Sequence, residues 1–237
     1  MSLAIPRLGL AIGAKRGYDI SLGASFDPTT IPNLQAWFSS TYGVVHTDNV
    51  VESWEAKYPA DGLVVSTAFN GPMVDGDSIY FDGVGSYMVS EDLSISSSTP
   101  RTFVVVGKMP NSIDREQEGF MNINDDCGYV FKESYSERMY LYVGGGGQVP
   151  NSNGANTNLS DFRTVVAVQK VSPDESYIKV GESVRTGTLS HLPILHTLYF
   201  GCRSPSSEFL LGNIKDVLIF DRALTSTEIS NLETYLA

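Results

Sequence analysis

Oxygen-bearing side chains gather in two short stretches of the chain that could bind a hard metal ion. Calcium takes about six to eight oxygen ligands from carboxylates, amides and carbonyls. The stretch NINDDCG offers Asn122, Asn124, Asp125 and Asp126, and the stretch VDGDS offers Asp75 and Asp77. Neither follows EF-hand spacing, and acidic turn residues are common in a chain with 27 acids. The first stretch is therefore the candidate calcium site, with Asp125 and Asp126 ahead of Asp75, and we expect no other cofactor.

Tyrosine and asparagine residues suggest a second chemistry, in which an aromatic surface with planar polar groups beside it recognises a sugar. The chain has 12 tyrosines, and YSERMYLY stands just before a glycine- and asparagine-rich loop that ends at Asn158. Tyr and Asn side chains in loops make adaptable contact surfaces. The exposed candidates are Tyr135, Asn151, Asn153 and Asn156. Tyr140 and Tyr142 share one face of an expected strand, so we interpret them as packing residues.

Nucleophilic and histidine-based chemistry finds little support. The chain has no GxSxG motif, and its 3 histidines are His46, His191 and His196. The last two are separated by a spacing that suits neither a helical HxxxH pair nor a strand HxH pair for a metal. The glycine run 144–147 lacks the Lys-Ser/Thr of a phosphate-binding loop. A catalytic triad, a zinc site and a nucleotide site are therefore disfavoured.

Charge and hydropathy exclude two further classes of partner. The 16 basic and 27 acidic residues of this 237-residue chain give a net charge of −11, which opposes attraction to the phosphates of nucleic acids. The longest apolar stretches, such as 103–106 and 217–220, fall far short of the roughly 20 residues that a membrane-spanning helix needs. We expect neither nucleic acid nor membrane as a partner. Cys127 and Cys202 are too few for a disulfide scaffold and are expected to be separate thiols.

The first 32 residues differ from the rest of the chain. They are apolar and punctuated by glycine and proline, and up to Tyr18 their only charges are Arg7, Lys15 and Arg16. This segment is either a flexible leader or strand of the main domain, or an arm that docks in an acidic, apolar groove of a partner. The candidate assembly residues of the arm are Leu3, Ile5, Arg7, Leu8, Leu10 and Ile12. Pro6 and Arg7 interrupt the apolar stretch, so we expect no classical export signal.

The remainder of the chain has the pattern of short strands. Segments rich in Val, Ile, Tyr, Phe and Thr alternate with turn residues such as Asp61-Gly62 and Asn153-Gly154. The expected strands are 37–38, 78–81, 87–89, 101–108, 120–123, 138–143, 163–170, 177–180, 197–200 and 210–220. Many short strands with little helix predict an all-β fold, a two-sheet antiparallel jelly-roll sandwich.

One helix is expected, at the end of the chain. Thr225 can cap its first turn while Glu228 reaches back to the Thr225 amide, which is the reciprocal pair of a capping box. Ile229, Leu232 and Leu236 then fall on one face. This apolar stripe should pack on the sandwich.

Several motifs resemble those of a known family. The segment GNIKDVLIFDRALTSTEISNLETYLA, residues 212–237, resembles the C-terminal signature of laminin G-like, concanavalin A-like jelly-roll domains. Residues 34–39 with 50–54 are similar to the opening of that family, SIYFDGVGSYMV to its FDG hairpin, and RTFVVVGKM to the strand that follows. The resemblance covers nearly all of residues 33–237, and it implies an extended N-terminal arm, 1–32, followed by one jelly-roll domain, 33–237, with a short C-terminal helix.

The resemblance also raises the question of catalysis, because this superfamily includes glycoside hydrolases. In the glucanases, the catalytic carboxylates alternate with apolar residues along one strand. Asp114, Glu116 and Glu118 have this spacing, but Arg115 and Gln117 between them cannot insert into a core. A second acidic pair, Glu52 and Glu55, lacks the spacing. We therefore expect no enzymatic activity.

The leading hypothesis from the sequence is a non-enzymatic structural or attachment protein of a bacteriophage virion, such as a capsid decoration, head-fibre or tail-attachment subunit. In this hypothesis, the short basic, apolar arm would dock to the particle, and the laminin G-like jelly roll would face outward. The expected partners are other virion proteins, further copies of the chain and host glycans. The alternative is a secreted or surface protein that binds or cleaves carbohydrate. The corresponding locations are the virion, after synthesis in the host cytoplasm, or the extracellular space.

Overall fold

A computed structural model describes most of the chain from residue 26 onward. The described residues are 26–59, 65–96, 99–110, 118–123, 129–132, 138–143, 147–149, 155–156, 159–205 and 207–237. The predicted arm residues, 3–12, lie outside this range. Within it, a short 3₁₀ turn, Pro28–Thr30, precedes the strands, and an α-helix, α1, covers Ser226–Leu236. No helix in the described part is long and apolar enough to cross a membrane.

Twenty strands are present in the described residues. In chain order, they are β1 (Leu34–Ser39), β2 (Val44–Thr47), β3 (Val50–Glu55), β4 (Val65–Phe69), β5 (Met73–Asp75), β6 (Ser78–Asp82), β7 (Tyr87–Ser90), β8 (Arg101–Lys108), β9 (Glu118–Ile123), β10 (Tyr129–Lys132), β11 (Arg138–Val143), β12 (Gly147–Val149), β13 (Ala155–Asn156), β14 (Arg163–Gln169), β15 (Ser176–Val180), β16 (Ser183–Gly187), β17 (Leu198–Phe200), β18 (Cys202–Ser204), β19 (Ser207–Phe209) and β20 (Leu211–Phe220).

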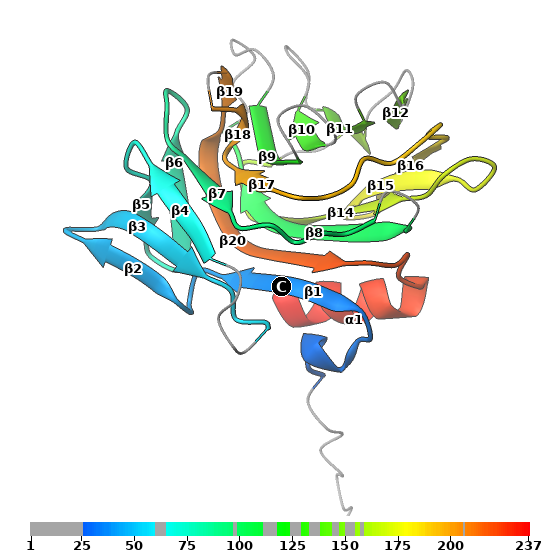
Figure 1. Ribbon diagram of the computed structural model, residues 1–237, viewed down its shortest axis with the longest axis horizontal. Coiled ribbons are helices and arrows are strands. Elements are labelled where there is room, and N and C mark those ends of the chain that lie inside the picture. Colours follow the sequence, from blue (N-terminus) through cyan, green and yellow to red (C-terminus); the bar gives the residue numbers. More distant parts are fainter. Residues whose placement is uncertain are drawn as a thin grey trace, which may run out of the picture.

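The strands form two antiparallel layers. The back layer has the order β1-β20-β8-β14-β15-β16, and the front layer has the order β4-β7-β17-β9-β10-β11. Strands β6, β5 and β3 connect the layers, because β20 pairs with β6, β6 with β5, and β3 with both β5 and β4. Figure 1 shows the front layer on one side of the back layer and α1 on the other. The predicted all-β antiparallel sandwich with a C-terminal helix is confirmed.

The central strands of the back layer, β8, β14 and β20, are apolar on both faces because they lie between two cores. In β14, Val165 and Ala167 belong to the core between the layers, whereas Val166 and Val168 belong to the core beneath α1. In β20, Val217 and Leu218 divide in the same way. A strand buried on both faces reads as a continuous apolar run rather than an alternating one. This double burial accounts for the run of apolar residues near the end of the chain.

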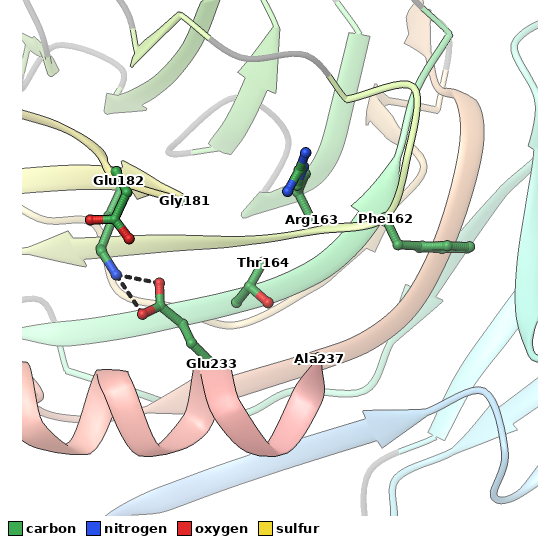
Figure 2. Close-up of a pocket in the computed structure, with 8 residues that line it drawn as sticks. Phe162, Arg163, Thr164, Gly181, Glu182, Glu233 and Ala237 are labelled. Atoms are coloured by element: carbon green, nitrogen blue, oxygen red, sulfur yellow. Dashed lines mark hydrogen bonds and ion pairs between the residues drawn. The ribbon is translucent and has the colours of Figure 1, made fainter.

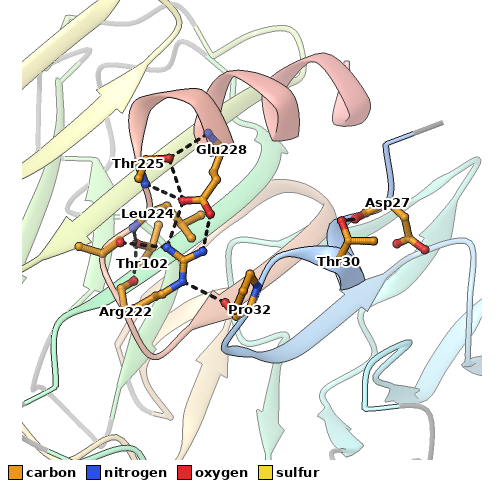
Figure 3. Close-up of polar contacts among 9 residues, drawn as sticks. Asp27, Thr30, Pro32, Thr102, Arg222, Leu224, Thr225 and Glu228 are labelled. Carbon is orange, nitrogen blue, oxygen red and sulfur yellow. Dashed lines mark hydrogen bonds and ion pairs between the residues drawn. The ribbon is translucent and has the colours of Figure 1, made fainter. Parts of the chain in front are cut away.

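The helix begins as the capping box predicts. The Glu228 amide donates to the Thr225 hydroxyl oxygen at 3.3 Å, and the Thr225 amide donates to the Glu228 carboxylate at 2.8 Å. Ile229 and Leu232 are buried against the back layer. Figure 3 shows this corner, where Arg222 also pairs with Glu228 at 2.5 Å. The helix therefore contributes the second core, as its apolar stripe predicts.

Some strands, among them β2, were not predicted from the sequence. The hairpin β2–β3 turns at Asp48 and Asn49, both of which have positive φ angles, 51° and 66°. Two consecutive residues with positive φ form the kind of turn that normally contains glycine. Because Asp-Asn carries no glycine, the usual turn signal is missing at this position.

Segments just before β1 contact the sandwich. The Phe26 ring packs edge-on against Tyr235 of α1, with ring centroids 5.9 Å apart, and Ile31 is buried in the core beneath α1. Asp27 caps the 3₁₀ turn, since its carboxylate accepts from the Thr29 amide at 2.9 Å. Residues 26–31 are thus tied to the helix side of the molecule.

Candidate functional site

The outer face of the front layer presents a stacked pair of aromatic rings. Phe69 of β4 and Tyr87 of β7 are direct cross-strand partners, and their rings lie parallel, 4.8 Å apart with an interplanar angle of 8°. Their direction follows from strand alternation. Met88, the neighbour of Tyr87, points into the core between the layers, so Tyr87 points outward. Phe69 is 42% exposed, and its ring therefore offers an apolar surface to solvent.

Two further rings extend this surface. Tyr199 of β17 lies 6.5 Å from Tyr87, and Phe209 of β19 lies 6.3 Å from Tyr87, centroid to centroid. Tyr87, Tyr199 and Phe209 are half-buried. We call Phe69, Tyr87, Tyr199 and Phe209 the aromatic patch. It is drawn from four strands, of which β4, β7 and β17 are neighbours in the front layer.

The hydroxyl group of Tyr87 remains protonated at neutral pH. Burial, together with the nearby Cys202, raises the pKa of Tyr87 above its ordinary value near 10. A protonated phenol can both donate and accept a hydrogen bond. The aromatic patch thus combines apolar ring faces with a polar group that can contact a hydroxyl-rich ligand.

A tightly hydrogen-bonded turn borders the aromatic patch. Asp82 ends β6, and its Oδ1 atom accepts hydrogen bonds from the amides of Val84, Gly85 and Ser86 and from the Ser86 hydroxyl, at 2.8 to 3.1 Å. Burial opposes ionisation of this carboxyl group, but the four donors outweigh it and lower the pKa of Asp82 to about 2. The carboxylate therefore fixes the turn that leads into Tyr87, directly after the expected strand 78–81.

The predicted glycan-binding residues fall largely outside the described part of the chain. Tyr135, Asn151 and Asn153 lie outside it, and Asn156 is placed only as the backbone partner of Arg138 in the β11–β13 pairing. Tyr140 is buried and packs against Tyr142. The four residues of the aromatic patch were not singled out from the sequence, because each stands in a segment that reads as ordinary strand or turn.

The first predicted calcium stretch is described at only one of its four residues. Asn122 of β9 is fully buried, opposite Tyr199, and its Oδ1 atom accepts from the Ile123 amide at 2.7 Å. The other three, Asn124, Asp125 and Asp126, lie outside the described residues. The carbonyl oxygen that would ligate calcium is thus already engaged at Asn122.

The two carboxylates of the second acidic stretch are already paired with side chains of the protein. Asp75 accepts from the Asn213 amide group at 2.9 Å, and Asp77 pairs with Lys215 at 2.5 Å. The hydrogen bond with Lys215 is the main reason that the pKa of Asp77 is lowered. Within the described part of the chain, no three His, Cys, Asp or Glu side chains cluster as a metal site would require.

The acidic and histidine candidates for catalysis are dispersed. Glu118 begins β9, whereas Asp114 and Glu116 lie outside the described residues. Glu52 accepts from the Thr47 hydroxyl at 2.6 Å across the β2–β3 hairpin. His196 lies 3.2 Å from a carboxylate oxygen of Asp92, both on the surface. None of these contacts brings a histidine beside a nucleophile.

A polar hollow of about 270 Å³ lies on the opposite side of the molecule. It is lined by the ends of β14 and β15 and by the C-terminal part of α1. Figure 2 shows Glu233 and Thr164 on the helix side of the hollow, with the Arg163 side chain pointing away from the helix. Glu233 pairs with Lys179 across this hollow. Phe162, at its rim, has the ammonium groups of Lys108 and Lys215 at 4.9 and 4.8 Å from its ring centroid. Within the hollow, the charges of Lys179 and Glu233 are thus paired with each other.

Comparison with known proteins gives structural neighbours alone. No family model and no curated protein sequence matches the chain. The chain is similar to Trypanosoma rangeli sialidase, with a TM-score of 0.60 and 15% identity over 85% of this chain and 32% of the sialidase. It is also similar to the botulinum neurotoxin serotype D/C binding domain, with a TM-score of 0.62 and 10% identity over 86% of this chain and 52% of that one.

A third neighbour matches the chain in extent as well as in fold. Domain 4 of AbnA, an extracellular arabinanase from Geobacillus stearothermophilus solved in complex with arabinotriose, aligns with a TM-score of 0.57 and 13% identity. The alignment covers 85% of this chain and 98% of that domain, whereas the chain spans only about a third of the length of the sialidase. At these identities the neighbours establish the fold, a β-sandwich of jelly-roll type.

Proposed function

We propose that the protein is a non-enzymatic carbohydrate-binding module and that the aromatic patch holds the glycan. The observation that carries the proposal is the exposed Phe69 ring stacked on Tyr87, with Tyr199 and Phe209 beside it. A sugar ring has an apolar face of C–H groups, which gains from burial against an aromatic ring, while its hydroxyl groups need hydrogen-bonding partners nearby. This supports the carbohydrate-binding alternative of the sequence analysis over virion attachment.

The similar structures support the same proposal. Domain 4 of AbnA aligns with this chain over nearly its whole length, and it was solved with arabinotriose. The Trypanosoma rangeli sialidase is a carbohydrate-active enzyme, although the chain spans only about a third of it. An oligosaccharide is therefore the ligand class to test first.

The carboxylate of Asp82, in the turn before Tyr87, is poorly suited to catalysis. A general acid in glycoside hydrolysis must hold a proton near the working pH, which requires a raised pKa. The four hydrogen bonds to Asp82 instead lower its pKa to about 2. Binding without turnover is accordingly the function that we propose.

Binding to a glycan array, followed by calorimetry on the best ligand, tests this function. We expect Phe69→Ala to weaken the affinity about tenfold or more, because the central aromatic contacts of an interface commonly contribute about 2 kcal/mol or more. Val45→Ala is the matched control, since Val45 is also an exposed strand residue, 54% exposed, on the separate β2 hairpin. A wild-type protein that binds no glycan, or a Phe69→Ala variant with unchanged affinity, would contradict the proposal.

A further inference from the structure

One charged side chain is enclosed within the sandwich. Arg101 begins β8 and is 0% exposed. It stands two residues before Phe103 and four before Val105, which both belong to the core between the layers, so its side chain leaves the strand on the same inner face. Burial lowers the pKa of Arg101 to about 10, which still leaves the guanidinium charged at neutral pH. The end of the core therefore contains a positive charge.

The guanidinium is only partly hydrogen-bonded. Its Nη2 atom donates to the carbonyl oxygens of Pro193 at 2.5 Å and Ser96 at 3.3 Å. Its Nε and Nη1 atoms have no hydrogen-bond partner in the described structure. The two carbonyls belong to segments that an Ile95–Leu195 bridge joins over this end of the sandwich. They solvate one nitrogen of the guanidinium but supply no counter-charge.

A second buried polar side chain stands directly opposite. Gln169 of β14 is the register partner of Arg101, and it too is fully buried. Directly opposed residues on one face of an antiparallel pair have Cβ atoms about 4.5–5.5 Å apart. Neither the Nε2 nor the Oε1 atom of Gln169 has a hydrogen-bond partner among the described residues. Unpartnered donors thus lie directly opposite each other on the inner faces of two neighbouring strands.

Buried polar atoms in native proteins nearly always have partners, and a buried charge without compensation is strongly destabilising. We propose that Arg101 and Gln169 form an internal binding site for a monovalent inorganic anion, of which chloride is the example to test. The anion would accept from the unpartnered guanidinium donors and from Gln169 Nε2, and it would neutralise the buried charge. A water molecule would accept these hydrogen bonds but would leave the positive charge uncompensated. A divalent anion would leave a buried negative charge.

The acidity of the protein makes this site easy to distinguish from surface binding. With a net charge of −11, the molecule as a whole repels anions. Anions also change stability without a site, through their exclusion from the protein surface. A stabilising effect of chloride over gluconate, at constant cation concentration and ionic strength, is therefore assigned to this site only where it is lost on replacing Arg101.

Chemical unfolding of the full chain tests the proposal, with sodium chloride exchanged for sodium gluconate, whose anion is too large for the interior. Above the dissociation constant, each tenfold rise in chloride should raise the ratio of folded to unfolded protein about tenfold. Bromide should replace chloride, and crystals grown in sodium bromide should show an anomalous peak within hydrogen-bonding distance of Nη1 or Nε of Arg101. Stability that is the same in chloride and gluconate, or water alone at this position, would overturn it.

Variants assign the effect to this site. Arg101→Met should abolish the chloride dependence, whereas Arg163→Met, which removes an exposed arginine of β14, should retain it. If Arg101→Met does not fold, Gln169→Met is the second variant, because it keeps the guanidinium. It should shift the chloride dependence of stability to higher chloride concentration. An unchanged dependence in every foldable variant would refute the assignment to Arg101 and Gln169. The outcome is independent of glycan binding at the aromatic patch.

Discussion

At the scale of single residues, Arg222 and Glu228 hold three parts of the chain together. Arg222 follows β20, pairs with Glu228 in the first turn of α1, and donates through Nε to the carbonyl oxygen of Pro32 at 3.0 Å (Figure 3). The Thr102 hydroxyl donates to the Arg222 carbonyl at 2.8 Å and accepts from the Leu224 amide at 3.0 Å. This polar cluster fixes the angle at which the helix meets the back layer.

The ionisation of Glu228 should make stability depend on pH. Its hydrogen bond with Arg222, aided by those with Thr225, outweighs burial and lowers the pKa of Glu228 from 4.5 to about 2. A carboxyl group whose pKa is lower in the folded state stabilises the protein above its unfolded pKa. That contribution is lost as the pH falls from about 4.5 to about 2, so acid should destabilise the protein in this window.

Urea unfolding between about pH 7 and pH 3 measures this effect. We expect Glu228→Gln to lower the free energy of unfolding near neutral pH by about 1 kcal/mol, because the partly exposed ion pair is screened by solvent. The variant should also lose less stability in acid than the wild type. The slope will not vanish, since Asp82 also has a pKa of about 2 in the folded state. Identical pH dependence of the two proteins would contradict the assigned role of Glu228.

At the scale of elements, α1 is held by packing as much as by its cap. Leu232 is fully buried in the same core as Val104, Val166 and Leu218 of the back layer. The helix has only 11 residues, and helices of this length are marginal in isolation. The back layer, in turn, needs the helix to cover its second apolar face.

Truncation of the helix contact should be costly. We expect Leu232→Ala to lower the free energy of unfolding by about 2–5 kcal/mol, since it leaves a cavity in addition to the lost burial. Asn231→Ala, at an exposed position of the same helix, should change it by no more than about 0.5 kcal/mol. Thermal or urea unfolding of both variants checks the comparison. A small effect of Leu232→Ala would mean that α1 is not part of the cooperative unit.

At the scale of the whole molecule, the two faces of the sandwich have different surroundings. The back layer is covered by α1 on its outer face, whereas the outer face of the front layer presents Phe69 to solvent (Figure 1). A contiguous group of aromatic rings that reaches the surface, as in the aromatic patch, marks a binding surface more readily than a single exposed side chain does. Because α1 covers the outer face of the back layer, we place the proposed glycan site on the front layer.

Removal of residues 1–22 separates folding from attachment. The contacts of Phe26 and Ile31 with the helix side of the molecule remain in such a variant. We expect this variant to stay soluble and folded and to bind glycan as the full chain does. If residues 3–12 dock the protein to a particle, the variant should no longer be incorporated into that particle. Circular dichroism, glycan titration and an assembly assay measure the three properties. Retained incorporation would contradict the proposed arm.

The local pattern of residues alone predicts the fold class, the C-terminal helix and ten of the twenty strands in the described residues. The capping box of Thr225 and Glu228, the stripe of Ile229 and Leu232, and the valine-rich run of β14 all act within a few residues of one another, so their spacing is visible in the sequence. The same is true of the turn after Asp82, whose donors follow it directly.

Only the tertiary structure identifies the two candidate sites. Phe69, Tyr87 and Tyr199 stand far apart in the chain, and strand periodicity says that alternate residues share a face without saying which face meets the second layer. Whether Tyr87 or Met88 points outward is decided when β4, β7 and β17 pair over the core. Arg101 likewise reads as a strand-end residue until the pairing with Gln169 encloses it. Long-range strand pairing creates both sites, and no short stretch of sequence records it.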